Sequence, residues 1–477
     1  MISFMVALGV LVFGYFVYSR LVAKAFVIDT NAKTPVFLKA DGVDYMPVSE
    51  KKATMIQFIS IAGTGPIFGA IQGAMWGPAS FFWIALGCVF AGAVHDYGSG
   101  MLSLRQDGST ISELIGVYLG PYVKILGRIL SLGLLIMLGA IFTVTPSDIL
   151  VTVTPFPRET WMVVIIGYFA LATVIPINKL IARVYPFFGA GMSLLAVGLA
   201  VALFVSGDIT RVPEFSFDNP HPVGRLLFPF MFITIACGAI SGFHATQSPI
   251  MARCIRNERE GRSVFYGAMI FEGFLALVWA AVAMSFFPDG LIGLGNAGPP
   301  PVVVSSISMG YFGVVGGIVA IVCVGIFPIS SGDTAMRACR LALADIFKID
   351  QGPVANRFKI MIPLFAIVIV LFFIDFSVLW MYSAWINQTL ASITLWTGAV
   401  YLARRGSMGH WFFTLPAIFM TFLTNGYLFV APLGQGFALA PAIGYPLGVL
   451  VALTCFGIFI KKSLIPGNRL TGSQIQK

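Results

Sequence analysis

The sequence predicts an all-α membrane protein with about thirteen transmembrane helices. Of the 477 residues, 58% are hydrophobic and only 10% are charged, whereas soluble proteins carry roughly 25% charged residues. Thirteen apolar stretches have about the twenty-residue length that a helix needs to cross a bilayer. Two of these stretches are interrupted near the middle by glycine and proline. Together these observations predict a polytopic protein with broken helices at its core, an arrangement typical of membrane transport proteins.

The predicted spans run along the whole chain and are separated by short polar loops. Because cytoplasmic loops retain Lys and Arg, the basic residues indicate the orientation. If the N-terminus lies outside and the C-terminus inside, all but three of the 29 basic residues fall on the inner side. The net charge of +9 therefore follows from topology, and we expect no nucleic-acid partner. The spans lie near residues 2–19, 54–76, 78–100, 124–145, 160–178, 185–206, 226–249, 264–286, 303–330, 360–375, 377–402, 411–430 and 441–460.

The most informative span is Met55–Trp76, which is apolar except for its central Gly63-Thr64-Gly65-Pro66. Glycine is conformationally free, proline lacks an N–H, and the residue before a proline avoids the helical region. We therefore expect this helix to break at about half depth. Irregular backbone at that depth is tolerated only where protein buries it or where it lines a cavity, so these four residues are predicted to contact substrate.

A second break is predicted in Leu226–Met251, where glycine, serine and proline interrupt another apolar span. Interrupted helices at corresponding positions of two halves are the sequence feature that best indicates the binding site of a transporter. Hydroxyl, amide and imidazole groups here could hydrogen-bond a peptide backbone or a small carboxylate, or they could merely bond a neighbouring helix. The predicted substrate contacts are Ser241, Gly242, His244, Thr246 and Gln247.

The two broken spans also predict an internal repeat. They lie five spans apart and cross the membrane in opposite directions, as inverted repeats of five helices do. The resulting architecture is a LeuT-like core of five plus five helices. The expected divisions are an N-terminal helix and inner loop at 1–53, the two repeats at 54–206 and 207–402, and two additional helices with the inner tail at 403–477.

Ionisable residues inside predicted spans are expected to be functional, because each costs several kcal/mol to place in a membrane. His95 and Asp96 are adjacent in the third span, and Glu272 is an isolated carboxylate in the eighth. We predict that these three residues couple transport to protons, with His244 as a further candidate. Glu272 could instead hydrogen-bond a neighbouring helix, and the sequence leaves this alternative open. The alternative for His95 and Asp96 is a structural pair at the membrane surface. His95, Asp96 and His244 could together hold a metal, but their spacing is atypical of metal ligands and no metal site is predicted.

Four segments resemble motifs of the carbon starvation protein A (CstA) family of inner-membrane transporters. They are Ala62–Ile67, Phe90–Tyr97, Ala236–His244 and Asp333-Thr334 with Arg337. The resemblance runs from about residue 35 to 345 and does not extend to the longer C-terminal sequence of the larger members. It implies uptake of short peptides or pyruvate during carbon starvation, in the plasma membrane of a bacterium or archaeon.

The end of the ninth span carries further candidates. In the LeuT type of transporter, hydroxyls on this helix and carbonyls at the first break hold a sodium ion, so a sodium site is possible here by analogy. Asp333 and Arg337 are spaced i,i+4 and are predicted to pair at an inner gate. The amphipathic segment 331–347 is predicted to lie on the inner membrane surface. The possible sodium ligands are Ser330, Ser331 and Thr334.

The sequence as a whole predicts a secondary active transporter that takes up short peptides, coupled to protons and working by alternating access. A pyruvate symporter driven by protons or sodium is the first alternative. A membrane-embedded hydrolase and a nutrient receptor without transport are more distant alternatives. Since the sequence has no phosphate-binding loop, ATP is not expected to drive this chain directly. We expect no enzymatic activity and no cofactor; the expected partners are substrate, protons or sodium, and the lipid bilayer, and the oligomeric state is not predicted.

Overall fold

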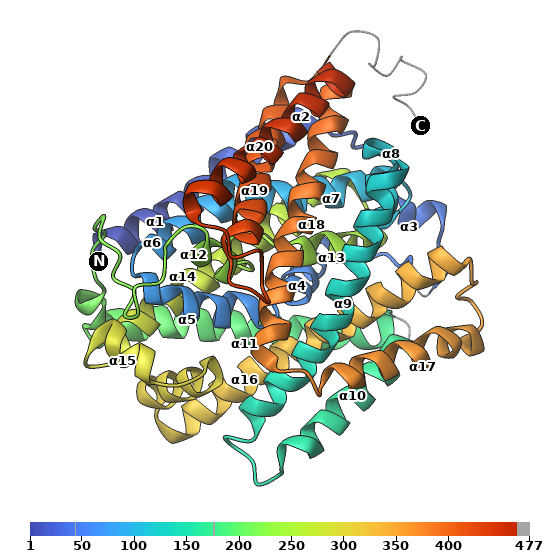
Figure 1. Cartoon of the computed structure of the whole chain (residues 1–477). Coiled ribbons are helices and arrows are strands. Elements are labelled where there is room, and N and C mark those ends of the chain that lie inside the picture. Colours follow the sequence, from blue (N-terminus) through green and yellow to red (C-terminus); the bar gives the residue numbers. More distant parts are fainter. Residues whose placement is uncertain (43, 175–176, 465–477) are drawn as a thin grey trace.

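Helices make up the regular structure of this chain (Figure 1). The computed structural model describes residues 1–42, 44–174 and 177–464, and within those ranges no β-strand occurs. Nine of the described helices are long and apolar enough to cross a membrane, or ten if the bent pair Glu50–Ala62 and Gly65–Trp76 forms one span. The prediction of an all-α polytopic membrane protein is confirmed.

Within the described residues, every predicted span falls on one helix or on several consecutive helices. Three positions fall outside the length and hydropathy criterion that the nine helices satisfy, so the number of thirteen crossings stays a prediction. Those positions are α10 (Arg158–Val174), the pair α12 (Phe230–Thr234) and α13 (Gly242–Ala252), and α18 (Phe376–Arg404). The other helices are α1 (Ile2–Phe13), α2 (Ser19–Phe26), α3 (Pro35–Leu38), α4 (Glu50–Ala62), α5 (Ala70–Gly73), α6 (Ala79–Phe82), α7 (Ala93–Arg105), α8 (Ile111–Leu119), α9 (Pro121–Leu150), α11 (Ile177–Val205), α14 (Ala268–Phe286), α15 (Gly290–Asn296), α16 (Pro300–Phe347), α17 (Val354–Leu371), α19 (Trp411–Val430) and α20 (Pro441–Phe459). Short π-helical stretches join several of them, at Gly14–Tyr18, Gly65–Gly69, Trp83–Gly92 and Arg262–Gly267.

The first predicted break is present between α4 and the helical stretch that begins at Gly65, and the two halves are bent by 57°. Gly63 has a φ of 45°, a conformation that residues with a Cβ rarely adopt. Its N–H donates to Ser331 Oγ of α16 at 3.0 Å, and Ser331 Oγ donates to Ile59 O at 2.9 Å. A hydroxyl from another helix therefore satisfies backbone groups that the break releases.

The second break is also present, but the chain is unwound only over residues 235–241. His244 and the polar residues after it consequently belong to α13, not to the break itself. Gly238 has a φ of 88°, and a Cβ there would lie 2.6 Å from Ala276 Cβ and 3.6 Å from Pro66 Cα. Since Pro66 belongs to the first break, the two breaks pack directly on each other.

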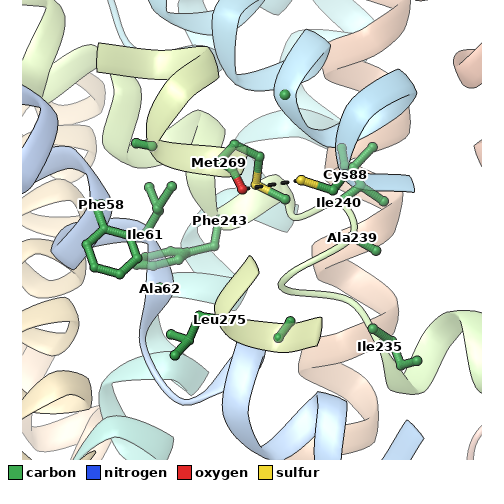
Figure 2. Packing of buried hydrophobic residues seen from close by; sticks show 14 of the residues in the cluster. Phe58, Ile61, Ala62, Cys88, Ile235, Ala239, Ile240, Phe243, Met269 and Leu275 are labelled. Atoms are coloured by element: carbon green, nitrogen blue, oxygen red, sulfur yellow. Dashed lines mark hydrogen bonds between the residues drawn. The ribbon is translucent and has the colours of Figure 1, made fainter. Parts of the chain in front are cut away.

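The helices around the breaks form the buried centre of the molecule. In Ala79–Arg105 and in Glu258–Phe286, 78% of the most apolar 18-residue segment is buried inside the protein, whereas only 22% of the corresponding segment is buried in Pro441–Leu464. Figure 1 accordingly shows α4 and α13 in the middle of the bundle and α20 at its edge. Figure 2 shows apolar side chains from α4, the second break and α14 gathered at this centre, including Phe58 and Phe243. The two breaks thus lie where lipid does not reach them.

The prediction of a surface helix at 331–347 is wrong, because these residues continue α16 into the protein interior. Asp333 is fully buried and Arg337 is 1% exposed. The irregular point in α16 is instead Gly313, where φ is 66°. The polar face that suggested a membrane surface meets protein partners instead of water, and the ninth span extends further inward than the predicted 303–330.

Two sequence predictions are not settled by these observations. The inner tail falls largely on residues 465–477, which lie outside the described residues. The division into repeats at residues 53, 206 and 402 stays a prediction that agrees with two breaks packed face to face.

Candidate functional site

Four titratable side chains form a continuous buried group, which we call the titratable cluster. His95 Nδ1 lies 2.8 Å from Asp96 Oδ1 on α7, and Asp96 Oδ2 lies 2.9 Å from His244 Nδ1 on α13. His244 Nε2 is 3.3 Å from Glu272 Oε2 on α14. All four side chains are 0% exposed. The His95–Asp96 pair therefore lies in the interior of the protein, and its role in proton coupling stays a prediction.

Glu272 connects the titratable cluster to the second break. Its other oxygen, Oε1, accepts the Gly238 N–H at 3.1 Å, one of the backbone groups that unwinding releases. The helix that carries Asp96 can approach because Gly92 has no side chain; a Cβ there would lie 2.3 Å from Ala239 O. A movement of the second break would therefore change the contact between Glu272 and His244.

Asp96 determines how protons are arranged in the titratable cluster. Each of its oxygens faces an imidazole Nδ1, so ionised Asp96 favours the form of both rings that carries a proton on Nδ1. His244 Nε2 then faces Glu272 Oε2 at 3.3 Å, the distance of an ion pair when that nitrogen carries a proton, and neither atom has a hydrogen-bond partner among the described residues. Removing that proton leaves one more uncompensated negative charge in a fully buried place, at a cost of several kcal/mol.

A cavity of about 40 Å³ lies where the two breaks meet. The hydroxyl of Thr64 and the indole Nε1 of Trp380 are buried in its wall and have no hydrogen-bond partner among the described residues. Leaving a buried donor unsatisfied costs about 1–3 kcal/mol, so the cavity suits a ligand that supplies acceptors, such as a carboxylate. The lining residues are Thr64, Gly65, Leu138, Phe142, Thr234, Ala236, Cys237, Phe243, Trp380, Ser383, Ala384 and Asn387.

Sequence reasoning missed the three polar cavity residues of α18, namely Trp380, Ser383 and Asn387. Asn387 Oδ1 accepts the Phe243 N–H at 2.7 Å and the Ser241 hydroxyl at 3.1 Å, and so caps the N-terminus of α13. The signal that could have found it is the amide pair Asn387-Gln388 within an apolar span, since such groups are costly in lipid and need partners.

Among the substrate contacts predicted from the sequence, Thr64 and Gly65 line the cavity, whereas Thr246 and Gln247 do not. Thr246 Oγ1 donates to Phe243 O at 2.6 Å and accepts from Gln247 Nε2 at 2.9 Å. The Gly242 position packs against α18, where a Cβ would lie 2.3 Å from a backbone oxygen. These three residues therefore support the wall of the cavity from outside in this conformation.

The hydroxyls predicted as possible sodium ligands all take part in protein hydrogen bonds. Ser331 bridges the two sides of the first break, as described above. Ser330 Oγ donates to Phe327 O at 2.7 Å, and Thr334 Oγ1 donates to Ser331 O at 3.0 Å. In this conformation the three hydroxyls stabilise α16 and the first break.

The predicted gate residues Asp333 and Arg337 are both buried on α16. Arg337 Nη2 donates to Ala172 O of α10 at 2.6 Å, and Arg337 Nη1 lies 3.8 Å from Asp44 Oδ1 in the loop before α4. Arg337 therefore ties α16 to two other segments. Its role in gating stays a prediction.

The titratable cluster and the cavity are neighbours through Cys237. Ligand atoms of Cys237, His244 and Glu272 lie within 4.8 Å of one another, and Cys237 lines the cavity. This trio could hold a metal by its spacing, and it differs from the trio weighed in the sequence analysis. The charge of a proton on His244 would consequently change the electrostatic environment of a ligand in the cavity, and the ligand would change that of His244.

The fold places the chain among the LeuT-like membrane proteins. MhsT in complex with L-phenylalanine matches with a TM-score of 0.59 at 14% identity, covering 86% of this chain and 99% of that chain. A mutant of the manganese transporter of Eremococcus coleocola matches with a TM-score of 0.52 at 11% identity, covering 89% and 98%. At such identities the likeness concerns the fold alone.

The chain belongs to the carbon starvation protein CstA family, because the model of that family matches residues 1–157 and 143–304. An uncharacterized membrane protein of Haemophilus influenzae is 40% identical over 341 residues, or 61% of this chain and 92% of that protein. The pyruvate/proton symporter BtsT of Escherichia coli is 27% identical over 61% of this chain. The peptide transporter CstA of Helicobacter pylori is 28% identical over 58% of this chain. This chain spans about half the length of the two named relatives, 50% in each case.

Proposed function

We propose that this chain is a proton-coupled secondary transporter that takes up a small organic solute by alternating access. The observation that carries the proposal is the titratable cluster of His95, Asp96, His244 and Glu272, because it is fully buried and bonded to the second break. Ionisable groups inside a membrane protein are expensive and typically form proton pathways. A catalytic role would instead require a nucleophile or an activated water beside a scissile bond.

In this mechanism, substrate and proton bind from the same side. A proton loads the contact between His244 and Glu272 while substrate fills the cavity between the breaks. Loading removes a buried negative charge, which lowers the cost of closing the site against water. When the breaks move and the other side opens, water reaches the cluster and the proton and the substrate leave together.

The closed cavity favours a small carboxylate such as pyruvate. A single water needs roughly 10–15 Å³ of such space, so a cavity of about 40 Å³ holds only a molecule of a few heavy atoms. The Thr64 hydroxyl and the Trp380 indole would donate to its carboxylate. Short peptides, the first expectation from the sequence, are the second candidate, because relatives named peptide transporters match at a comparable identity; a peptide would need the cavity to widen.

Uptake into proteoliposomes tests this proposal. We expect labelled pyruvate, or else a labelled dipeptide, to accumulate when the outside is made acidic without sodium, and a protonophore to abolish the accumulation. If accumulation follows only an imposed sodium gradient, transport is coupled to sodium, and the hydroxyls of α16 become the candidate ion ligands. Binding without flux would indicate a receptor, and release of amino acids without accumulation would indicate a hydrolase.

We place the chain in the plasma membrane of a bacterium or archaeon, with the N-terminus outside and the C-terminus in the cytoplasm, because basic loops stay inside. Single cysteines introduced at Gly290 or Gly434, in a background without the native cysteines, should react with a membrane-impermeant thiol reagent applied to intact cells. Cysteines at Asn257 or Gly406 should react only after permeabilisation. The reverse pattern would invert the orientation of every loop.

A further inference from the structure

An apolar groove of about 510 Å³ opens on the outer surface of the bundle between α1, α4, α11 and α14. Its wall is almost entirely hydrocarbon and includes the aromatic rings of Phe58, Phe271 and Phe274. In a membrane protein such a groove faces lipid and not water. A polar hollow of about 580 Å³ begins where the groove ends, and the two share Tyr15 and Ser263.

The polar hollow contains two arginines beside two carboxylates. It is lined by Arg259 and Arg262, together with Glu50 and Glu260. Both carboxylates already have partners: Glu260 lies 3.7 Å from Arg256, and Glu50 accepts the Ser263 hydroxyl at 2.5 Å. The Arg262 guanidinium lies 5.3 Å from the centre of the Tyr15 ring, directly above the groove. Together with Arg256, the arginines here number three against two carboxylates, so the mouth of the groove carries a net charge of +1.

The groove has the length of one lipid tail. From Arg262 to Phe274 the chain is helical over twelve residues, which at about 1.5 Å per residue spans about 18 Å. One half of the hydrocarbon core of a bilayer is about 15 Å thick. A tail that begins at the arginines would therefore reach Phe274 near the middle of the membrane.

We propose that this groove is a binding site for an anionic phospholipid, with the phosphate at Arg259 and Arg262 and one acyl chain along α4 and α14. Arginine suits a phosphate because its planar guanidinium can donate two parallel hydrogen bonds. Basic pockets between helices at the cytoplasmic side are the kind of site that holds such head groups. Since Thr54, Met55 and Phe58 of α4 line the groove, the lipid contacts the half-helix that leads into the first break and links it to α1.

The test uses the full chain purified in a neutral detergent, so it depends neither on the proposed transport activity nor on the orientation. Thermal melting and native mass spectrometry would be followed during titration with phosphatidylglycerol, phosphatidylcholine or glycerol 3-phosphate. We expect retained binding and a higher melting temperature with phosphatidylglycerol, and much weaker effects with the other two. Equal effects of the two lipids, or glycerol 3-phosphate binding as tightly as phosphatidylglycerol, would overturn the proposal.

Variants locate the site. Arg259→Ala with Arg262→Ala should weaken phosphatidylglycerol binding roughly tenfold or more, and Arg259→Ala alone, at an exposed position, should weaken it less. Lys461→Ala with Lys462→Ala removes the same charge beyond α20, where both side chains are exposed, and should leave binding unchanged. Val197→Trp fills the groove from its exposed α11 side. This substitution should weaken the binding of phosphatidylglycerol and of phosphatidylcholine. Equal loss in the lysine variant, or undiminished binding in Val197→Trp, would contradict the assignment.

Discussion

Asp96→Asn is expected to reduce uptake driven by a pH gradient at least about 100-fold, the scale on which a positioned proton-transfer group contributes. The carboxylate faces an imidazole Nδ1 with each oxygen, at 2.8 and 2.9 Å. An asparagine amide keeps the shape but turns one acceptor into a donor, so it can satisfy only one of the two rings. The His244 ring, and with it the 3.3 Å contact between its Nε2 and Glu272 Oε2, would then lose its fixed position.

The informative measurement is the ratio of substrate exchange to gradient-driven uptake. Exchange does not need the empty carrier to return without its proton, so we expect exchange in Asp96→Asn to stay near the parent level. Asp148→Asn is the matched control, because Asp148 pairs with Arg158 at 2.6 Å and is partly exposed; its ratio should equal that of the parent. A parental ratio in Asp96→Asn would remove Asp96 from the coupling mechanism and leave it a structural anchor.

Gly65→Ala should separate the two breaks and abolish transport. A Cβ at Gly65 would lie 2.2 Å from Cys237 Cβ and 2.5 Å from its Sγ. The first of these atoms is fixed to the backbone, so no side-chain rotation relieves the clash, and overpacking of this kind costs about 1–3 kcal/mol. We expect a lower melting temperature in detergent and an uptake rate reduced more than tenfold.

A second substitution distinguishes this clash from a general defect. Cys237→Gly removes both contacting atoms, so Gly65→Ala with Cys237→Gly should regain most of the melting temperature that the single variant loses. Gly133→Ala on α9 is the control, because nothing lies within 4 Å of a Cβ there, and it should be neutral or slightly stabilising. If Gly65→Ala melts like the parent, the two breaks do not pack as closely as described.

The substrate cavity was only partly predictable from the sequence. Glycine and proline at both breaks act through local backbone preferences, so their positions were evident, and Thr64 and Gly65 do line the cavity. Thr246 and Gln247 lie on α13, which begins at Gly242, and do not line the cavity in this conformation, so their contact with substrate stays a prediction. Trp380 and Asn387 were missed, because their contribution depends on which face α18 turns toward the breaks.

The sequence by itself determined the membrane class, the all-α architecture and the two interrupted helices, because hydropathy, charge asymmetry and helix-breaking residues are properties of short stretches of chain. It also indicated His95, Asp96 and Glu272 one at a time, through the cost of a charge in an apolar span. Only the tertiary structure joined α7, α13 and α14 so that these groups form one titratable cluster with His244. The tertiary structure also shows that residues 331–347, which were expected to form a surface helix, continue α16 into the protein interior. Such contacts depend on packing between segments that are distant in the chain, 148 residues apart for Asp96 and His244 and 34 for Gly238 and Glu272, and no local preference encodes them.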